Sequence, residues 1–306
     1  MKTNQAANVS RAALSGYLTI LAVCLDLVGQ VRAGQTASGA PTGETPAPPA
    51  PSRAPLKSVR EGPSPDTESA IHGFPAFLDS FGKKQADGDF VQSPEGNALH
   101  VKVMFDFGAG HHIQENALFR QKPRLTQESW SWSETKNKEI LRRFEVDFRS
   151  GKASAEKGEG KDAKRWSENL KIEPGRTFAG VGFVLAIKSL RVRLMKGERI
   201  EMQAIGLTPK PRLVTVELSY GSLDQMTMAG RTVNGDRFLI HPKVPAIAKL
   251  FVDVTDTIIW LTTPPTVGFL RWEGRLVEVN DPAIRVDLYS GDHSGPARPL
   301  HANDHH

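Results

Sequence analysis

The longest apolar run outside the N-terminus, residues 177–197 (TFAGVGFVLAIKSLRVRLMKG), constrains the fold most strongly. Apolar side chains recur there at near-helical spacing in two rows, and basic residues concentrate in the second half, where cations suit the helix dipole. We therefore predict a single helix over 177–196 that is capped by Thr177 and ended by Gly197. The period-two alternation over 190–194 leaves open a shorter helix followed by a strand.

Period-two alternation dominates the chain from about residue 98 onward. Large apolar residues alternate with mostly polar ones from Leu99 to Phe107, which is typical of a half-buried strand. Comparable patterns predict further strands at 113–120, 127–133, 140–148, 199–206, 212–220, 225–231, 237–241, 257–262, 267–272 and 284–289. The Asn234-Gly235 pair predicts a tight hairpin turn within this series.

Three segments have less regular patterns. Residues 71–81 suggest a short amphipathic helix or an ordered lead-in, 151–169 are charged and loop-like, and 246–252 fit either a strand or one helical turn. Strands joined by short turns and interrupted by one apolar helix predict a mainly β domain with one central helix. The expected architecture is a curved antiparallel sheet, or open half-barrel, wrapped on that helix.

The N-terminus has the features of an export signal. Lys2 and Arg11 precede an apolar run, and Val31-Arg32-Ala33 fits a small-x-small cleavage site. We predict a signal peptide over 1–33 and a periplasmic or secreted protein of the bacterial envelope. The residues before Cys24 resemble a lipoprotein cleavage box, so lipid anchoring at Cys24 is the less favoured alternative.

Three regions follow the predicted signal. Residues 34–66 are rich in Pro, Ser, Thr and Gly and predict a disordered linker, 67–290 form the β-rich domain, and 291–306 predict a disordered His-rich tail. Cleavage would remove the only cysteine, which excludes disulfides in the mature chain. It would also leave 36 basic and 33 acidic residues, so the net charge falls from +5 to +3. That charge is too small to indicate a nucleic-acid partner.

No pattern in the sequence specifies a catalytic, metal or cofactor site, and we predict neither a metal nor a cofactor. His111 and His112 are neighbours on a predicted strand, so their side chains face opposite ways and do not share an ion. Arg271 and Glu273 lie on the same side of a predicted strand near Trp260. This arrangement predicts a polar cleft and, as an alternative function, a hydrolase site.

Four motifs, FAGVGFVLAI, IHPKVPAIAKLF, TIIWLT and FLRWEGRLVEVNDPAIRVDL, resemble a poorly characterised group of secreted bacterial proteins. More loosely, the expected architecture resembles the open β-barrels of periplasmic lipoprotein carriers and lipid-binding lipoproteins. In those proteins a curved sheet and a helix enclose an apolar cavity. The resemblance implies apolar-ligand handling, and it assigns no functional residue.

The composition of the predicted helix suits such a cavity, because its Gly and Ala residues leave gaps among large side chains. We expect the helix to form the cavity floor and aromatic side chains of the strands to face it. The expected ligand-binding side chains are Phe105, Phe107, Trp130, Trp132, Phe183, Ala186, Ile187 and Trp260.

These features predict an exported, non-enzymatic binding module. Its expected ligand is an apolar small molecule such as a lipid or acyl chain, or a lipidated protein partner, and peripheral membrane association is compatible with this role. One alternative is an envelope hydrolase with a site near Arg271 and Glu273. A second alternative is an assembly protein that uses its edge strands.

Overall fold

The structure, a computed structural model, describes residues 68–158, 160–228, 230–243, 255–264 and 267–288. The chain divides into two units, Met1–Val59 and Arg60–His306, and every described residue belongs to the second. The predicted signal peptide, the whole predicted linker, the His-rich tail and segment 246–252 therefore lie outside the described residues.

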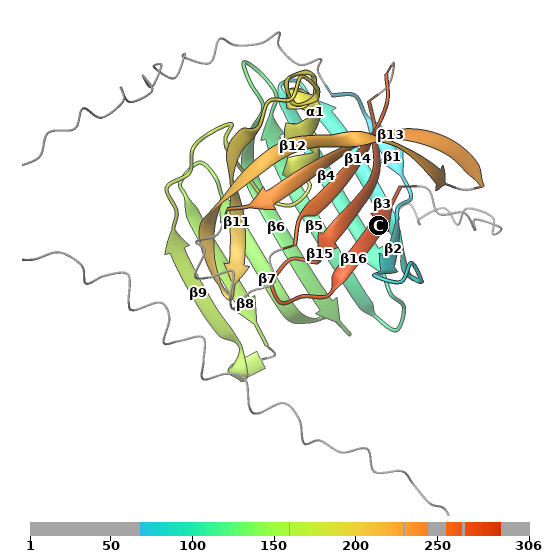
Figure 1. The fold of residues 1–306 in the computed structure, drawn as a ribbon. Coiled ribbons are helices and arrows are strands. Elements are labelled where there is room, and N and C mark those ends of the chain that lie inside the picture. The colour runs from blue at the N-terminus through green and yellow to red at the C-terminus, as the bar shows by residue number, and fades with distance from the viewer. Residues whose placement is uncertain (1–67, 159, 229, 244–254, 265–266, 289–306) are drawn as a thin grey trace, which may run out of the picture. The chain divides into compact units, whose positions relative to one another are not determined.

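The described residues form one curved sheet with a single α-helix (Figure 1). The elements before the helix are β1 (Ile71–Gly73), β2 (Ala76–Asp79), β3 (Lys84–Glu95), β4 (Ala98–Asp106), β5 (His111–Arg120), β6 (Thr126–Lys136), β7 (Glu139–Asp147), β8 (Lys152–Lys157), the 3-10 turn η1 (Gly160–Asp162), β9 (Lys164–Asn169) and β10 (Thr177–Phe178). They are followed by α1 (Gly182–Met195), β11 (Ile200–Thr208), β12 (Lys210–Met228), β13 (Arg231–Pro242), β14 (Thr257–Thr262), β15 (Phe269–Arg275) and β16 (Ala283–Asp287).

The strands are hydrogen-bonded in the order β10-β11-β12-β13-β14-β15-β16-β2-β3-β4-β5-β6-β7-β8-β9, and β1 pairs with β3. All pairs are antiparallel except β10 with β11. The strand β16 pairs with β2, which joins the last described strand to one of the first. The predicted fold class, mainly β with one helix and an open curved sheet, is confirmed.

The main core fills the concave side of the sheet, which we call its inward face. Helix α1 contributes Phe183, Leu185, Ala186, Ile187 and Leu194 to this core, and side chains from both halves of the sheet pack around them. Lys188 of α1 pairs with Glu68 at 2.5 Å, and Arg191 pairs with the buried Asp236 of β13. Within the described part of the chain, no helix is long and apolar enough to span a bilayer.

The helix begins five residues later than predicted, whereas its end agrees. Thr177 does not cap it, because Thr177 and Phe178 pair with Gln203 and Ala204 of β11 as the short strand β10. Gly180 then turns the chain with φ of +49°, and α1 follows with Val181 at its N-cap. The helix continues to Met195, which excludes the alternative of a strand over 190–194.

Two segments that we predicted as non-strand are strands. Residues 71–81 contain β1 and β2 and no helix, because their backbone pairs with β3 and β16 as strands of the sheet. The charged segment 151–169 contains β8 and β9, where the small buried residues Ala153 and Ala155 alternate with polar ones. The strand β3 was not predicted.

The predicted hairpin turn at Asn234-Gly235 is also wrong, because both residues lie inside β13. The predicted strands 212–220 and 225–231 are largely one long strand, β12, which continues past an irregularity between Tyr220 and Ser222. Gly235 allows the side chain of Leu270 to pack close to the backbone of β13, because a Cβ at this position would lie 3.0 Å from Leu270 Cδ1. The chain reverses instead between Met228 and Arg231.

Candidate functional site

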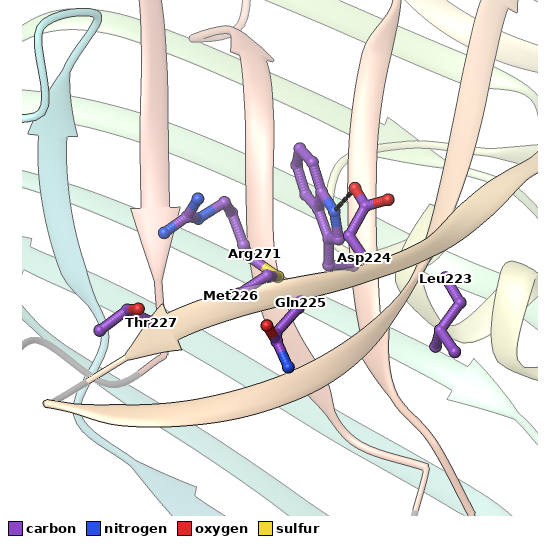
Figure 2. Close-up of a pocket in the computed structure, with 7 residues that line it drawn as sticks. Leu223, Asp224, Gln225, Met226, Thr227 and Arg271 are labelled. Carbon is purple, nitrogen blue, oxygen red and sulfur yellow. Dashed lines mark hydrogen bonds between the residues drawn. The ribbon is translucent and has the colours of Figure 1, made fainter.

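The long β12–β13 pair carries a second apolar cluster, separate from the main core. We define the arm as residues 222–228 of β12 together with 231–235 of β13. Met226 and Met228 of the arm pack with Trp260 and Leu270, which come from β14 and β15. Figure 2 shows the arm crossing these strands, so the arm is held against the sheet by apolar contacts.

A cleft of about 600 Å³ lies between the arm and the sheet. Its lining residues are Leu223, Asp224, Gln225, Met226, Thr227, Trp260 and Arg271. Five of these seven residues are consecutive along β12, so the cleft follows the arm for its length. The structure therefore brings the predicted Trp260 and Arg271 together in one cleft.

Asp224 is fixed at the cleft by two hydrogen-bond donors and lies near one cation. Its carboxylate accepts hydrogen bonds from the Ser222 hydroxyl at 2.5 Å and from Trp260 Nε1 at 2.9 Å, and Arg237 Nε lies 3.6 Å away. The hydrogen bonds from Ser222 and Trp260 lower the pKa of Asp224. Asp224 is therefore a carboxylate at neutral pH and a poor proton donor.

Arg271 is also fully engaged. Its Nε donates to Asp287 Oδ1 at 2.6 Å and its Nη2 to Oδ2 at 3.1 Å, a bidentate pair across β15 and β16. The guanidinium carbon lies 5.8 Å from the Trp260 ring centroid, within cation–π range. Glu273 lies on the same side of β15 as predicted, but its carboxylate is 3.7 Å from Arg271 and does not line the cleft.

Most of the predicted apolar lining lies in the main core. Phe105, Trp130 and Trp132 are buried there with the helix residues Phe183, Ala186 and Ile187. Ala186 and Ile187 are 1% and 0% exposed, so side chains enclose this part of α1. Phe107 packs against the same core and stacks on His111, whereas Trp260 belongs to the second cluster.

Glu115 of β5 is an inward-facing carboxylate, outside the cleft, that the sequence analysis missed. It lies on the inward face, between Val103 of β4 and Trp132 of β6. Its Oε1 accepts hydrogen bonds from Val181 N at 2.7 Å and Trp130 Nε1 at 2.8 Å. No ion pair of Glu115 is found among the described residues. A signal was available, because Glu115 alternates with the apolar Ile113 and Ala117.

Glu115 takes the place of a side-chain cap for α1. The side chain of Val181, the N-cap residue, makes no capping hydrogen bond. Instead, the Glu115 carboxylate on β5 accepts a hydrogen bond from the backbone N–H of Val181. Gln127 of β6 similarly accepts the Ala179 N–H at 2.8 Å. These two inward polar residues hold the turn that precedes the helix. Burial raises the pKa of Glu115, and the two hydrogen bonds oppose that rise only in part.

The Glu115→Gln variant tests this environment. The folded protein binds the proton of Glu115 more tightly than the unfolded chain, so wild-type stability falls as pH rises above about 4.3, the ordinary glutamate pKa. The variant lacks this loss. We expect the unfolding free energy of the variant to rise relative to that of the wild type as pH increases from about 4.3 toward the raised folded-state pKa of Glu115, and the difference to stay constant at higher pH. Denaturant unfolding over this range measures the gap. Glu145→Gln, at a carboxylate whose side chain is 54% exposed, is the matched control.

The histidine pair behaves as two separate side chains. His111 Nε2 lies 2.9 Å from Glu134 Oε1, and His112 Nδ1 lies 3.5 Å from Asp106 Oδ1. Across the described ranges, no group of three or more His, Cys, Asp or Glu side chains is placed to hold a metal ion.

A second cleft, of about 680 Å³, lies over strands β3 to β7. Its lining mixes apolar side chains with short polar ones, among them Ser93, Ser129 and Ser131, and with charged residues such as Lys102 and Asp147. These lining residues come from five strands, whereas five of the seven residues of the cleft under the arm are consecutive along β12. We therefore take the cleft under the arm as the candidate site.

Comparisons with known proteins add little to this description. No family model matches the chain, and no curated protein matches it. One similar solved structure is the β-barrel-like protein of domain of unknown function DUF1849 from Brucella abortus, with 9% identity and a TM-score of 0.40. The match covers 72% of this chain and 96% of that one. The identity and the TM-score are too low to transfer a fold or a role from that protein to this chain.

Proposed function

We propose that this chain is a non-enzymatic binding module of the bacterial envelope, and that it holds its partner in the cleft under the arm. The observation that supports the proposal most directly is the state of the charged groups there. Asp224 accepts hydrogen bonds from Ser222 and Trp260, and Arg271 donates two hydrogen bonds to Asp287, before any ligand arrives. Fixed, neutralised charges suit recognition, because they present defined hydrogen-bonding groups without a large desolvation cost.

The same geometry favours binding over hydrolysis. A general acid or base needs a pKa near the working pH, and the lowered pKa of Asp224 moves it away from neutrality. Arg271 is bound to Asp287 by two hydrogen bonds, so it is not free to receive a developing negative charge. Leu223, 56% exposed at the cleft, supplies an apolar contact for a partner.

A site-specific crosslink tests the proposal. The photoreactive residue benzoylphenylalanine replaces Leu223 in the full chain, expressed with its own N-terminus in a bacterial host. Irradiation should give a discrete adduct, because Leu223 is exposed and lines the cleft. Intact-mass measurement reads both the adduct and the start of the mature chain. We expect that start at Gly34, since Val31-Arg32-Ala33 precedes it.

The matched control places the same photoreactive residue at Val192, which is 63% exposed on α1 and does not line the cleft. An adduct at both positions would indicate nonspecific contact, and no adduct at Leu223 would contradict the proposed function. A chain that keeps its first 33 residues, or that starts at a lipidated Cys24, would contradict the proposed export route.

An apolar ligand inside the sheet is the second candidate. Val103, Trp272 and Val286 pack against the main core yet remain only partly buried, so the interior is not closed around them. If a lipid or acyl chain occupies this interior, native mass spectrometry of the gently purified chain will show a lipid-sized increment. That increment would persist when Leu223 is replaced, which separates this candidate from binding at the cleft. A bare chain would argue against it.

A further inference from the structure

The cleft follows a strand that has a neighbour on one side only. β12 pairs with β11 over Lys210–Leu218 and with β13 as far as Met228. β13 in turn pairs with β14 only from Gly235 onward. Within the described ranges, residues 222–228 of β12 therefore have no strand along their second edge.

Alternate residues of this run direct their backbone groups to the open edge. Only two residues separate β12 from β13, and Met228 faces Arg231 at the close of the hairpin. In a two-residue hairpin, the two residues that flank the turn exchange backbone hydrogen bonds with each other. Along each strand from that pair, every second residue is hydrogen-bonded to the opposite strand, and the residues between them are not. Met226 and Asp224 are thus bonded to β13. Leu223, Gln225 and Thr227 therefore present their N–H and C=O groups to the open edge of β12.

The length and the side chains of this edge suit an added strand. Five consecutive residues line the cleft, which at about 3.3 Å per residue extends for about 16 Å, a typical strand length. Natural edge strands are commonly protected by lysine or proline. Residues 222–228 (SLDQMTM) contain neither, and the side chains of Leu223, Gln225 and Thr227 are exposed and uncharged.

We propose that an extended segment of a partner protein adds as a strand to the open edge of β12 at Leu223, Gln225 and Thr227. This inference rests on the proposed function and specifies the class of partner. Backbone pairing supplies the affinity, and pockets for alternate side chains supply the specificity. The partner segment is uncharged where it faces Arg271 and Asp224, because their charges are already satisfied, and it carries an apolar residue against Leu223.

Selection from a library of random linear peptides of about ten residues, displayed on phage, tests the proposal with the full chain immobilised. One enriched peptide is then synthesised with single N-methyl groups along its backbone. N-methylation removes a donor, so every second position should lose about tenfold in affinity while the intervening positions change less than about threefold. Amide exchange of the chain should slow at Leu223, Gln225 and Thr227 when the peptide binds.

Two variants of one residue serve as the matched pair. Gln225→Pro removes an N–H that β13 does not use, and Gln225→Ala removes only the side chain. We expect about tenfold weaker binding for Gln225→Pro and nearly wild-type binding for Gln225→Ala. If Gln225→Pro does not fold, the N-methyl series on the wild type still decides the question.

The following outcomes would overturn the inference: no peptide whose binding depends on the cleft, an N-methyl series without alternation, or a dimer of the chain joined through the arm. Competition by residues 34–66 of the same chain would also overturn it, because the occupant would then be internal. An adduct at Leu223 combined with any of these results would leave the proposed function standing and remove only strand addition.

Discussion

Replacing Arg142 with methionine should lower the free energy of unfolding by about 3–5 kcal/mol. Its guanidinium binds three carboxylates at once: Glu134 at 2.7 Å, Glu278 at 3.0 Å and Asp281 at 2.8 Å. The side chains of all four residues are largely buried, and Arg142 also lies over the Trp132 ring. Methionine keeps most of the volume but leaves these carboxylates without their main cation, which is the costly way to break a buried network.

Denaturant unfolding near neutral pH measures this loss, and Arg143→Met is the matched control. Arg143 is the next residue along β7, its side chain is 42% exposed, and its ion pair with Glu145 spans 3.9 Å. Exposed pairs of this kind contribute little, so the control should change by less than about 0.5 kcal/mol. A loss below about 1 kcal/mol for Arg142→Met would show that the network does not hold the fold.

Gly180→Ala should cost about 3–8 kcal/mol for two separable reasons. Gly180 has φ of +49°, a left-handed conformation that costs an alanine about 1–2 kcal/mol. A Cβ would also lie 1.9 Å from Glu115 Oε1 and 2.5 Å from Trp130 Nε1. Glu115 would then have to move and would lose the hydrogen bonds from Val181 and Trp130, each worth about 1–3 kcal/mol when buried.

Gly197→Ala isolates the backbone contribution. Gly197 follows the end of α1 with φ of +85°, and a Cβ there would meet no atom within 4 Å. We expect only about 1–2 kcal/mol for this variant, again from denaturant unfolding. In a Glu115→Ala background the excess cost of Gly180→Ala should shrink, because the clash partner is gone. Equal losses at the two glycines would refute the role of the close approach.

The elements that the sequence predicted well are those with one deeply buried face. In β4, Leu99, Val101 and Phe105 are buried and the intervening residues are more exposed, so alternation is strong. Alternation did not predict β8, because its buried residues are Ala153 and Ala155. Alanine is only weakly apolar, so its hydropathy contrast with the polar residues around it is small and no clear period-two pattern results. Propensity also misled at Asn234-Gly235, where packing against Leu270 overrides the turn preference of the pair.

The candidate site could be predicted only in part, because it depends on register and on how the arm folds back. Trp260 and Arg271 were identified as near neighbours along the chain. Asp287, which fixes Arg271, lies opposite it through the pairing of β15 with β16, and no local pattern specifies that register. Asp224 lies between the two predicted strands 212–220 and 225–231. In the structure these strands form one long strand, β12, and this continuity places Asp224 within hydrogen-bond distance of Trp260.

The pairing of β2 with β16 also has a consequence in time. Asp79 lies opposite Ile284, about 200 positions further along the chain. During synthesis, β2 therefore cannot pair with β16 until that C-terminal strand has been made. Contacts of such long range slow folding, because the loop between them must close first. The late arrival of β16 therefore delays completion of the sheet until almost the whole domain has been synthesised.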